Sequence, residues 1–261
     1  MIASGDTATL LSRVEDAGLN ASAPPQQRWV DGWLVRFSPG KAQRARCINA
    51  VSVGRLSLDE RLALCQALYA EHGLPMLVRM TPFSQPEGLD HALAQRGFVV
   101  HDDTRVMVCP AIDMPAAETL PQGLEFAGVS LEAYAHIVGE FRGTSNVGVQ
   151  AHARRLLSSP VPYRGWVVRK SDGTPLACAQ FAIEGDCVGL YDVFTALPTR
   201  AQGLARKLCA HLLRQAVLLG ARVAYLQVDS ANHAARSVYN KLGFTDAYGY
   251  HYRAAERPPA G

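Results

Sequence analysis

The chain lacks the features that mark nucleic-acid-binding, membrane and secreted proteins. Its formal net charge is only +3 over 261 residues, without a basic run that has interleaved aromatic residues, so we expect no nucleic-acid partner. No apolar run reaches the ~20 residues that a membrane-spanning helix needs. No signal-peptide pattern opens the sequence, and we therefore expect a cytoplasmic protein with no membrane partner.

Paired cysteine motifs are also missing. The six cysteines show no Cys-x-x-Cys spacing. The neighbours of His211 and His233, on predicted helices, give no base or metal geometry, so we expect ordinary surface histidines. We expect buried, reduced thiols and no metal site. At 48% hydrophobic and 19% charged residues, the chain can build a sizeable core and is long enough for two modest domains.

A strand, a turn and a helix are predicted between residues 190 and 220. Aromatic and β-branched residues at 190–195 predict a strand, which Pro198 ends. From Leu204 to Leu219, apolar residues spaced three to four apart predict a helix that Gly220 ends. The turn before this helix aims free backbone N–H groups and the positive end of the helix dipole at whatever lies above the strand.

This turn has the composition of an anion site. Gly203 has no Cβ and Ala205 nearly none, so a phosphate can approach the backbone closely. Arg200 adds a charged, two-pronged donor, and a pyrophosphate suits the arrangement. A glycine at such a turn also serves the turn alone, so this segment needs support from elsewhere in the chain.

A second strand and a short helix follow. Residues 223–228 predict the strand, and Asp229-Ser230 provide capping residues for a helix from about Asn232 to Leu242. Asn232 and Tyr239 share one face of this helix at three-to-four-residue spacing. On composition alone, a tyrosine there is more often a core aromatic than an acid catalyst.

Together the two segments resemble the coenzyme A signature of the GNAT superfamily of N-acetyltransferases. The matching pattern is Arg200-x-x-Gly203-x-Ala205, followed by Asn232-x-x-Ala235-x-x-Val238-Tyr239-x-x-x-Gly243-Phe244. The resemblance covers about residues 122 to 253. It implies a mixed α/β fold, with a mostly antiparallel GNAT-type sheet flanked by helices, and acetyl-CoA as the cosubstrate.

The resemblance also implies roles for individual residues. Tyr239 would protonate the departing thiolate. The chemistry of acetyl transfer adds a need to stabilise the oxyanion, which a backbone N–H near Val193 or Phe194 could meet. The implied cofactor-binding residues lie in the strand for the pantetheine arm, in the turn and first helical turn for the pyrophosphate, and at one position downstream: Val193, Phe194, Thr195, Arg200, Ala201, Gln202, Gly203, Leu204, Ala205, Arg206 and Asn232.

Amine acetylation also needs a base and an acceptor site. An alkylammonium ion of pKa ~10 is about one part in a thousand neutral at pH 7, so losing its proton costs ~4 kcal/mol. Asp192, in an otherwise apolar strand, is the candidate base; the alternative is an aspartate that faces solvent or pairs with an arginine. Arg142, in a polar connector between two predicted helices, is the candidate ligand for an acceptor carboxylate. The alternative is a merely flexible connector.

Three prolines between residues 110 and 121 interrupt all periodicity. We therefore predict a linker at 113–121, between a domain at 1–112 and a catalytic domain at 122–261. The elements predicted before the cofactor motif are strands and helices in mixed order: strand 124–129, helices 131–141 and 149–157, and strands 163–169 and 175–183.

The first half repeats part of the second. Residues 89–108 follow the same plan as 236–253: helix, Gly-Phe, strand, turn, strand, with the turn of the first copy at His101-Asp102-Asp103. Leu93 stands where Tyr239 stands, and the helix predicted at 58–69 lacks the glycine turn. We infer two tandem GNAT-like halves, the first degenerate and without a cofactor site. Residues 29–37 alternate large side chains, which predicts one strand packed in the core. The alternative is that Trp29, Trp33 and Arg36 face the active cleft and select a substrate.

The sequence thus predicts an acetyl-CoA-dependent N-acetyltransferase that acts by direct transfer on a small-molecule amine, such as an amino acid, an analogue or a toxic metabolite. A protein N-terminus or a lysine is the alternative acceptor. A non-catalytic acyl-CoA sensor is the alternative of another class. The acyl-chain preference and the oligomeric state stay open, with a homodimer as one candidate.

Overall fold

The computed structural model describes residues 4–38 and 42–255, which divide into two compact units. Unit 1 takes the chain up to Ala21, Val106–Val228 and Asn232–Ala247. Unit 2 takes Ser22–Arg105, Asp229–Ala231 and the chain from Tyr248 onward. Strands β5 (Phe98–Cys109) and β11 (Thr245–Ala255) run from one unit into the other.

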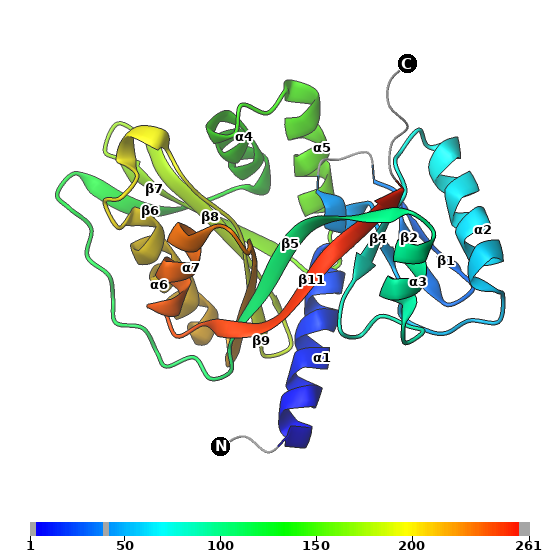
Figure 1. Cartoon of the computed structure of the whole chain (residues 1–261). Helices are drawn as coiled ribbons and strands as arrows, with labels where there is room; N and C mark the ends of the chain where they lie inside the picture. The colour runs from blue at the N-terminus through cyan, green and yellow to red at the C-terminus, as the bar shows by residue number, and fades with distance from the viewer. Residues whose placement is uncertain (1–3, 39–41, 256–261) are drawn as a thin grey trace. The chain divides into compact units, whose positions relative to one another are not determined.

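Unit 1 contains one helix from the start of the chain and most of the elements after residue 106. They are α1 (Ser4–Ala21), β6 (Leu124–Val129), α4 (Leu131–Phe141), α5 (Asn146–Leu157), β7 (Tyr163–Lys170), β8 (Pro175–Glu184), β9 (Cys187–Thr195), the 3-10 turn η2 (Leu197–Thr199), α6 (Leu204–Leu218), β10 (Val223–Asp229) and α7 (His233–Asn240) (Figure 1). Its strands follow the order β10-β9-β8-β7-β6, and only β10 and β9 run parallel.

Strand β8 is buried along most of its length, which explains its continuous apolar sequence. Its successive residues face opposite sides of the sheet. Ala179 and Phe181 join the core cluster built around α6, whereas Gln180 contacts Asp192 on the other side. Helices α6 and α7 lie side by side (Figure 1), so the predicted cofactor motif and the predicted acid belong to neighbouring helices.

Unit 2 is built around a smaller sheet. Its elements are β1 (Gln27–Val30), β2 (Trp33–Arg36), the 3-10 turn η1 (Gln43–Ala45), β3 (Ile48–Asn49), α2 (Leu58–Glu71), β4 (Leu77–Met80), α3 (Leu89–Gln95), and parts of β5 and β11. The strand order is β1-β2-β3-β4-β11, with β3 and β4 parallel. Trp33, Leu68 and Leu93 are fully buried in its core.

The two units repeat one connection. In unit 1, β9, α6 and β10 form a parallel strand–helix–strand unit, followed along the chain by α7 and β11. In unit 2, β3, α2 and β4 form the same unit, followed by α3 and β5. The mixed, mostly antiparallel fold is thus confirmed, and the repeat reaches further than the Gly-Phe similarity on which the tandem prediction was based.

Three predicted local structures are wrong. Residues 29–37 form a hairpin rather than one strand, because Asp31 and Gly32 adopt positive φ angles of 40° and 83° and so form a tight turn. Trp33 is buried as expected, but Trp29 is 63% exposed. The turn expected at His101-Asp102-Asp103 is only a bend within β5, where Asp102 has φ 50°. Strand β11 is also a single strand, without the predicted turn.

The predicted linker packs on unit 1. Leu120 lies against the core cluster, as does Ile112 just before the linker, and Arg214 of α6 donates a hydrogen bond of 2.9 Å to the carbonyl oxygen of Pro115. The carboxylate of Glu118 accepts bonds from Arg206 and Lys207 of α6. The proline-rich sequence rules out regular structure here, yet the segment is held by apolar and ionic contacts.

All six cysteines are buried and unpaired. Within residues 4–38 and 42–255, no helix combines the length and the apolar character that crossing a membrane requires.

Within unit 2, Asp90 forms a cluster of ionic contacts with His251 and Arg253 of β11. The Asp90 carboxylate accepts hydrogen bonds from Arg253 Nε at 2.8 Å and Nη2 at 3.1 Å, and lies 2.8 Å from His251 Nε2. The hydrogen bonds from Arg253, together with those from His251, outweigh the opposing effect of burial and lower the pKa of Asp90 to about 2.

We expect Asp90→Asn to lower the free energy of unfolding at pH 7 by about 1 kcal/mol, a small value because the carboxylate is 44% exposed. The folded pKa is lowered, so the ionised group stabilises above its unfolded pKa of ~3.9, and this contribution is lost as the pH falls through the folded value. Urea unfolding should show a difference from wild type that is constant from pH 7 to ~5 and shrinks as the pH falls from there to ~2. A difference that stays constant over the whole range would contradict this origin. Asp59→Asn, which breaks a pair with Arg96 at a 75% exposed carboxylate, is the surface control.

Candidate active site

The N-terminus of α6 offers unoccupied backbone donors. Gly203 is the N-cap residue with φ 75° and ψ 5°, and no side chain caps the helix. The first amide groups of a helix have no partner within it. A Cβ added to Gly203 would meet no atom within 4 Å, so the space next to these amides is open. A negatively charged group suits this position, because the backbone N–H groups can donate to it and the positive end of the helix dipole attracts it.

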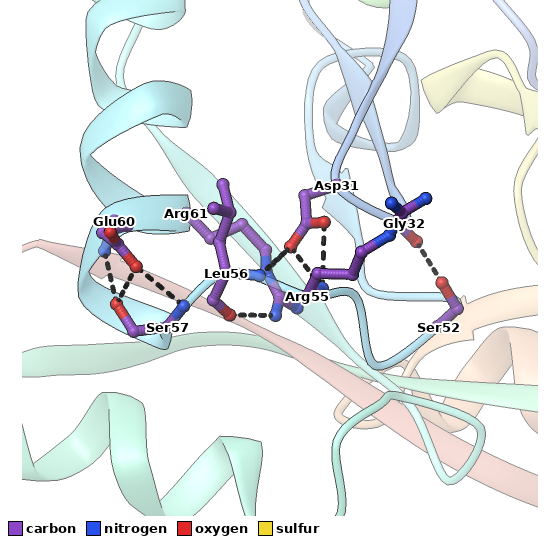
Figure 2. Close-up of polar contacts among 8 residues, drawn as sticks. All are labelled: Asp31, Gly32, Ser52, Arg55, Leu56, Ser57, Glu60 and Arg61. Carbon is purple, nitrogen blue, oxygen red and sulfur yellow. Dashed lines mark hydrogen bonds and ion pairs between the residues drawn. The ribbon is translucent and has the colours of Figure 1, made fainter.

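The equivalent position in unit 2, before α2, is filled by the chain itself (Figure 2). Asp31 accepts from the backbone N–H groups of Arg55 and Leu56 at 2.8–2.9 Å. Ser57 and Glu60 form a capping box, with Ser57 N donating to Glu60 Oε2 at 2.9 Å. The Asp31 and Glu60 carboxylates thus accept from the backbone N–H groups that precede α2, whereas no side chain caps the N-terminus of α6. The contrast supports the prediction that unit 2 has no cofactor site, which itself stays a prediction.

Strands β9 and β10 separate at the level of the predicted thioester. Their register runs from Cys187 paired with Val223 to Leu190 paired with Leu226, although β9 continues to Thr195 and β10 to Asp229. The facing edges beyond Leu190 and Leu226 are therefore unpaired with each other. Backbone groups on such edges must find another partner, and an extended pantetheine arm is of suitable shape.

A bulge lies where β9 leaves β10. The register between β8 and β9 shifts between Cys178 and Gln180, so two residues of β9, Asp192 and Val193, face one residue of β8. Asp192 has a positive φ of 49°, which is unusual for this residue in a strand. Tyr134 of α4 donates a hydrogen bond of 2.8 Å to the Asp192 carbonyl oxygen and so helps to hold this conformation.

The Asp192 side chain is surrounded by donors. Arg142 Nη2 lies 2.9 Å from Oδ1, and Gln180 Nε2 lies 2.8 Å from Oδ2. His152 Nε2 lies 3.2 Å from Oδ2, within ion-pair distance. Burial raises the pKa of Asp192, but the His152 ring and the guanidinium groups of Arg142 and Arg155 lower it more, to well below the usual range. The carboxylate is therefore ionised throughout the physiological pH range.

Tyr239 of α7 is 7% exposed and belongs to the same core cluster as Cys209 of α6. Its ring meets that of Phe244 at 6.1 Å between centroids. Among the described residues, none forms a hydrogen bond with its hydroxyl group. Burial, with a smaller effect from Cys209, raises the pKa of Tyr239 well above its usual value. The hydroxyl is thus protonated and has a free hydrogen-bonding capacity.

Comparison with known proteins identifies the domain around this site. Residues 134–244 match the acetyltransferase (GNAT) family. The chain is 25% identical over 236 residues to the uncharacterized N-acetyltransferase YobR of Bacillus subtilis (strain 168), covering 87% of this chain and 91% of the relative.

Residues 134–244 form a GNAT acetyltransferase domain. The resemblance drawn from the two motifs is therefore confirmed.

Solved structures share the fold of a larger part of the chain. A GCN5-related N-acetyltransferase from Kribbella flavida aligns with a TM-score of 0.67 and 19% identity over 96% of both chains. A tandem GNAT protein from the clavulanic acid biosynthesis pathway aligns with a TM-score of 0.62 and 13% identity, over 78% of this chain and 70% of that one. The fold similarity thus extends beyond the GNAT domain and includes a tandem protein.

Within the GNAT domain, the predicted cofactor-binding side chains differ in whether other residues already hold them. Arg200 makes two weak contacts, from Nε to the Thr195 carbonyl oxygen at 3.4 Å and from its guanidinium to the Phe194 ring at 5.5 Å from the centroid, and is available to a phosphate. The Arg206 side chain is held by Glu118, so only its amide faces the anion position. Asn232, rather than the predicted Asp229-Ser230, caps α7 by accepting from Ala235 N at 3.1 Å; its Nδ2 atom stays available.

Arg142 of the GNAT domain is bound to Asp192, so its predicted role toward an acceptor carboxylate requires that it share its donors. His152 is the residue that sequence patterns missed. It lies in α5, and no motif or spacing connects it to a strand that follows more than 30 residues later. His211, expected to be an ordinary surface residue, instead stacks on Phe126 with centroids 4.2 Å apart and packs against Trp166.

Proposed function

We propose that the GNAT domain transfers the acetyl group of acetyl-CoA directly to the primary amine of a small molecule. The observation that carries this proposal is the open, uncapped N-terminus of α6 beside the separated edges of β9 and β10. Together they offer an anion site and an extended backbone edge, as a pyrophosphate joined to a pantetheine arm requires.

In the proposed complex, the amides from Gln202 to Arg206 and the Arg200 side chain bind the pyrophosphate, with Gly203 and Ala201 providing the positive φ angles of the turn, 75° and 62°. Backbone groups from Val193 to Thr195 bind the pantetheine arm, and Asn232 Nδ2 contacts the cofactor. The bulge at Asp192 and Val193 supports this arrangement, because it leaves the backbone at that point without a regular strand partner.

The reaction has three chemical requirements. A neutral amine must attack, the thioester carbonyl must be polarised, and the sulfur must receive a proton. A backbone N–H near Val193 or Phe194 stabilises the oxyanion. Tyr239 donates its hydroxyl proton to the sulfur, which its unpartnered and protonated state supports. Asp192 provides the negative charge beside the attacking ammonium ion, and Arg142 orients Asp192 and any acceptor carboxylate.

An amine panel assayed by free-thiol release tests this function. We expect acetyl-CoA alone to be hydrolysed slowly and at least one small amine to raise thiol release by ~tenfold or more, because attack by the acceptor amine is the step that releases the thiol. The acetylated product is confirmed by mass spectrometry. Binding of acetyl-CoA without stimulation by any amine would support a sensor instead, and stimulation only by peptides would indicate a protein acceptor.

A further inference from the structure

His152 and Asp192 form a pair that connects α5 to the bulge of β9. His152 Nε2 lies 3.2 Å from Asp192 Oδ2, and the two side chains are 17% and 22% exposed. Asp192 immediately precedes Val193, the residue proposed to contact the thioester carbonyl. The contact thus places an imidazole ring of α5 beside the residue that precedes the proposed thioester contact.

The surroundings of Asp192 make it a weak proton acceptor. Arg142 and Gln180 donate to its two oxygens, and Arg155 adds positive charge. A carboxylate stabilised in this way keeps its charge when a proton is offered. It can, however, fix the orientation of an imidazole and stabilise the imidazolium ion that forms when that ring takes a proton.

We propose that His152 is the general base that deprotonates the acceptor ammonium ion, and that Asp192 is the positioning residue that holds its ring. His152 Nε2 is buried, lies 3.2 Å from Asp192 Oδ2 and makes no aligned hydrogen bond. A proton on Nε2 suits its carboxylate neighbour and leaves the lone pair on Nδ1, which no described residue occupies by a hydrogen bond. The base role rests on the acetyl transfer proposed above.

The protons balance as follows. Neutral His152 takes one proton from the ammonium group, R–NH₃⁺, and the free amine forms a C–N bond to the thioester carbon. The C–S bond breaks, the thiolate takes the Tyr239 proton, and the second proton lost by the nitrogen returns to the tyrosinate through water. His152 then releases its proton to solvent, so that R–NH₃⁺ and acetyl-CoA yield the amide, CoA and H⁺.

The test compares His152→Gln with His136→Gln, an exposed histidine of the neighbouring helix α4. We expect His152→Gln to lower kcat/KM for the amine by ~100-fold and to leave the Kd of acetyl-CoA within about twofold, with no change in His136→Gln. Imidazole in the buffer should restore turnover to His152→Ala, which a purely structural histidine would not permit. Asp192→Asn should show a smaller loss.

NMR of the ring nitrogens tests the pair without turnover. The His152 signals, assigned by their absence in His152→Gln, should shift in Asp192→Asn. Full activity of His152→Gln, or a His152→Ala variant that imidazole does not rescue while the wild type is active, overturns the base role alone. Unshifted ring signals overturn the pairing. A wild-type protein that acetylates no amine overturns the proposed function and the base role together.

Discussion

Replacing Gly203 by valine should raise the Kd of acetyl-CoA by about thirtyfold, or about 2 kcal/mol. Gly203 is the N-cap of α6 with φ 75°, and the space that its missing Cβ leaves is open. A valine side chain would occupy the volume proposed for the pyrophosphate and would disturb the amides that hydrogen-bond to it, which are worth most when their partner is charged. Calorimetric titration with acetyl-CoA and with CoA measures the effect.

The control for this variant is Gly88→Val. Gly88 is the N-cap of α3 in unit 2, with φ 77° and ψ 1°, and a Cβ added there would also meet no atom within 4 Å. Both variants therefore incur the same left-handed backbone strain, of roughly 1–2 kcal/mol, and should lose similar thermal stability. Only Gly203→Val should lose cofactor affinity. Equal affinities in the two variants would remove the pyrophosphate from this turn.

Elements with strong local signals could be predicted from the sequence. The prediction of α4 at 131–141 is confirmed at both ends, because Ser130 caps it and the apolar face is regular. Helix α6 is confirmed to within one residue of the predicted end, because Gly203 and Gly220 bound it. In both cases the residues that end the element lie next to it in the chain, so a single sequence contains the necessary information.

The wrong predictions concern turns and strands, where the local sequence signal was missed or was overridden by strand pairing. The Asp31-Gly32 turn was hidden within a run of large residues, although Asp-Gly is a strong hairpin signal. Polar residues at 101–103 predicted a turn, but β5 continues through them with only Asp102 at positive φ. Here the pairing of distant strands outweighs local propensity, which is the usual limit of reading strands from local sequence.

The candidate site divides in the same way. The cofactor motif was visible because a helix N-terminus, a glycine and an arginine lie within seven residues of one another. The neighbours of Asp192 could not be predicted in this way. Arg142 comes from the end of α4, His152 from α5 and Gln180 from β8, so they lie far apart in the chain. Only the folded sheet brings these side chains together. The sequence therefore predicted an aspartate in an apolar strand, but not the cations and the imidazole that determine what it can do.

Tyr239→Phe should lower kcat by ~100-fold, the contribution expected of a general acid, and leave the Kd of acetyl-CoA nearly unchanged. The hydroxyl has no partner among the described residues, so its removal should cost little stability. Tyr225→Phe is the matched control. It deletes a buried hydroxyl that lies 2.7 Å from Tyr191 Oη and should cost about 1 kcal/mol of stability without a comparable loss of kcat.

The pH dependence of kcat separates proton donation from packing at Tyr239. Its pKa is raised by burial, so the hydroxyl keeps its proton at alkaline pH and the proposed donor is not lost there. We therefore expect no alkaline decline of wild-type kcat from this group up to pH ~10, the ordinary tyrosine value. A decline that starts near pH ~9 and disappears in Tyr239→Phe would contradict the buried, protonated state. Unchanged turnover in Tyr239→Phe with a good acceptor would remove Tyr239 as the acid, and the sulfur would then have to take its proton from water.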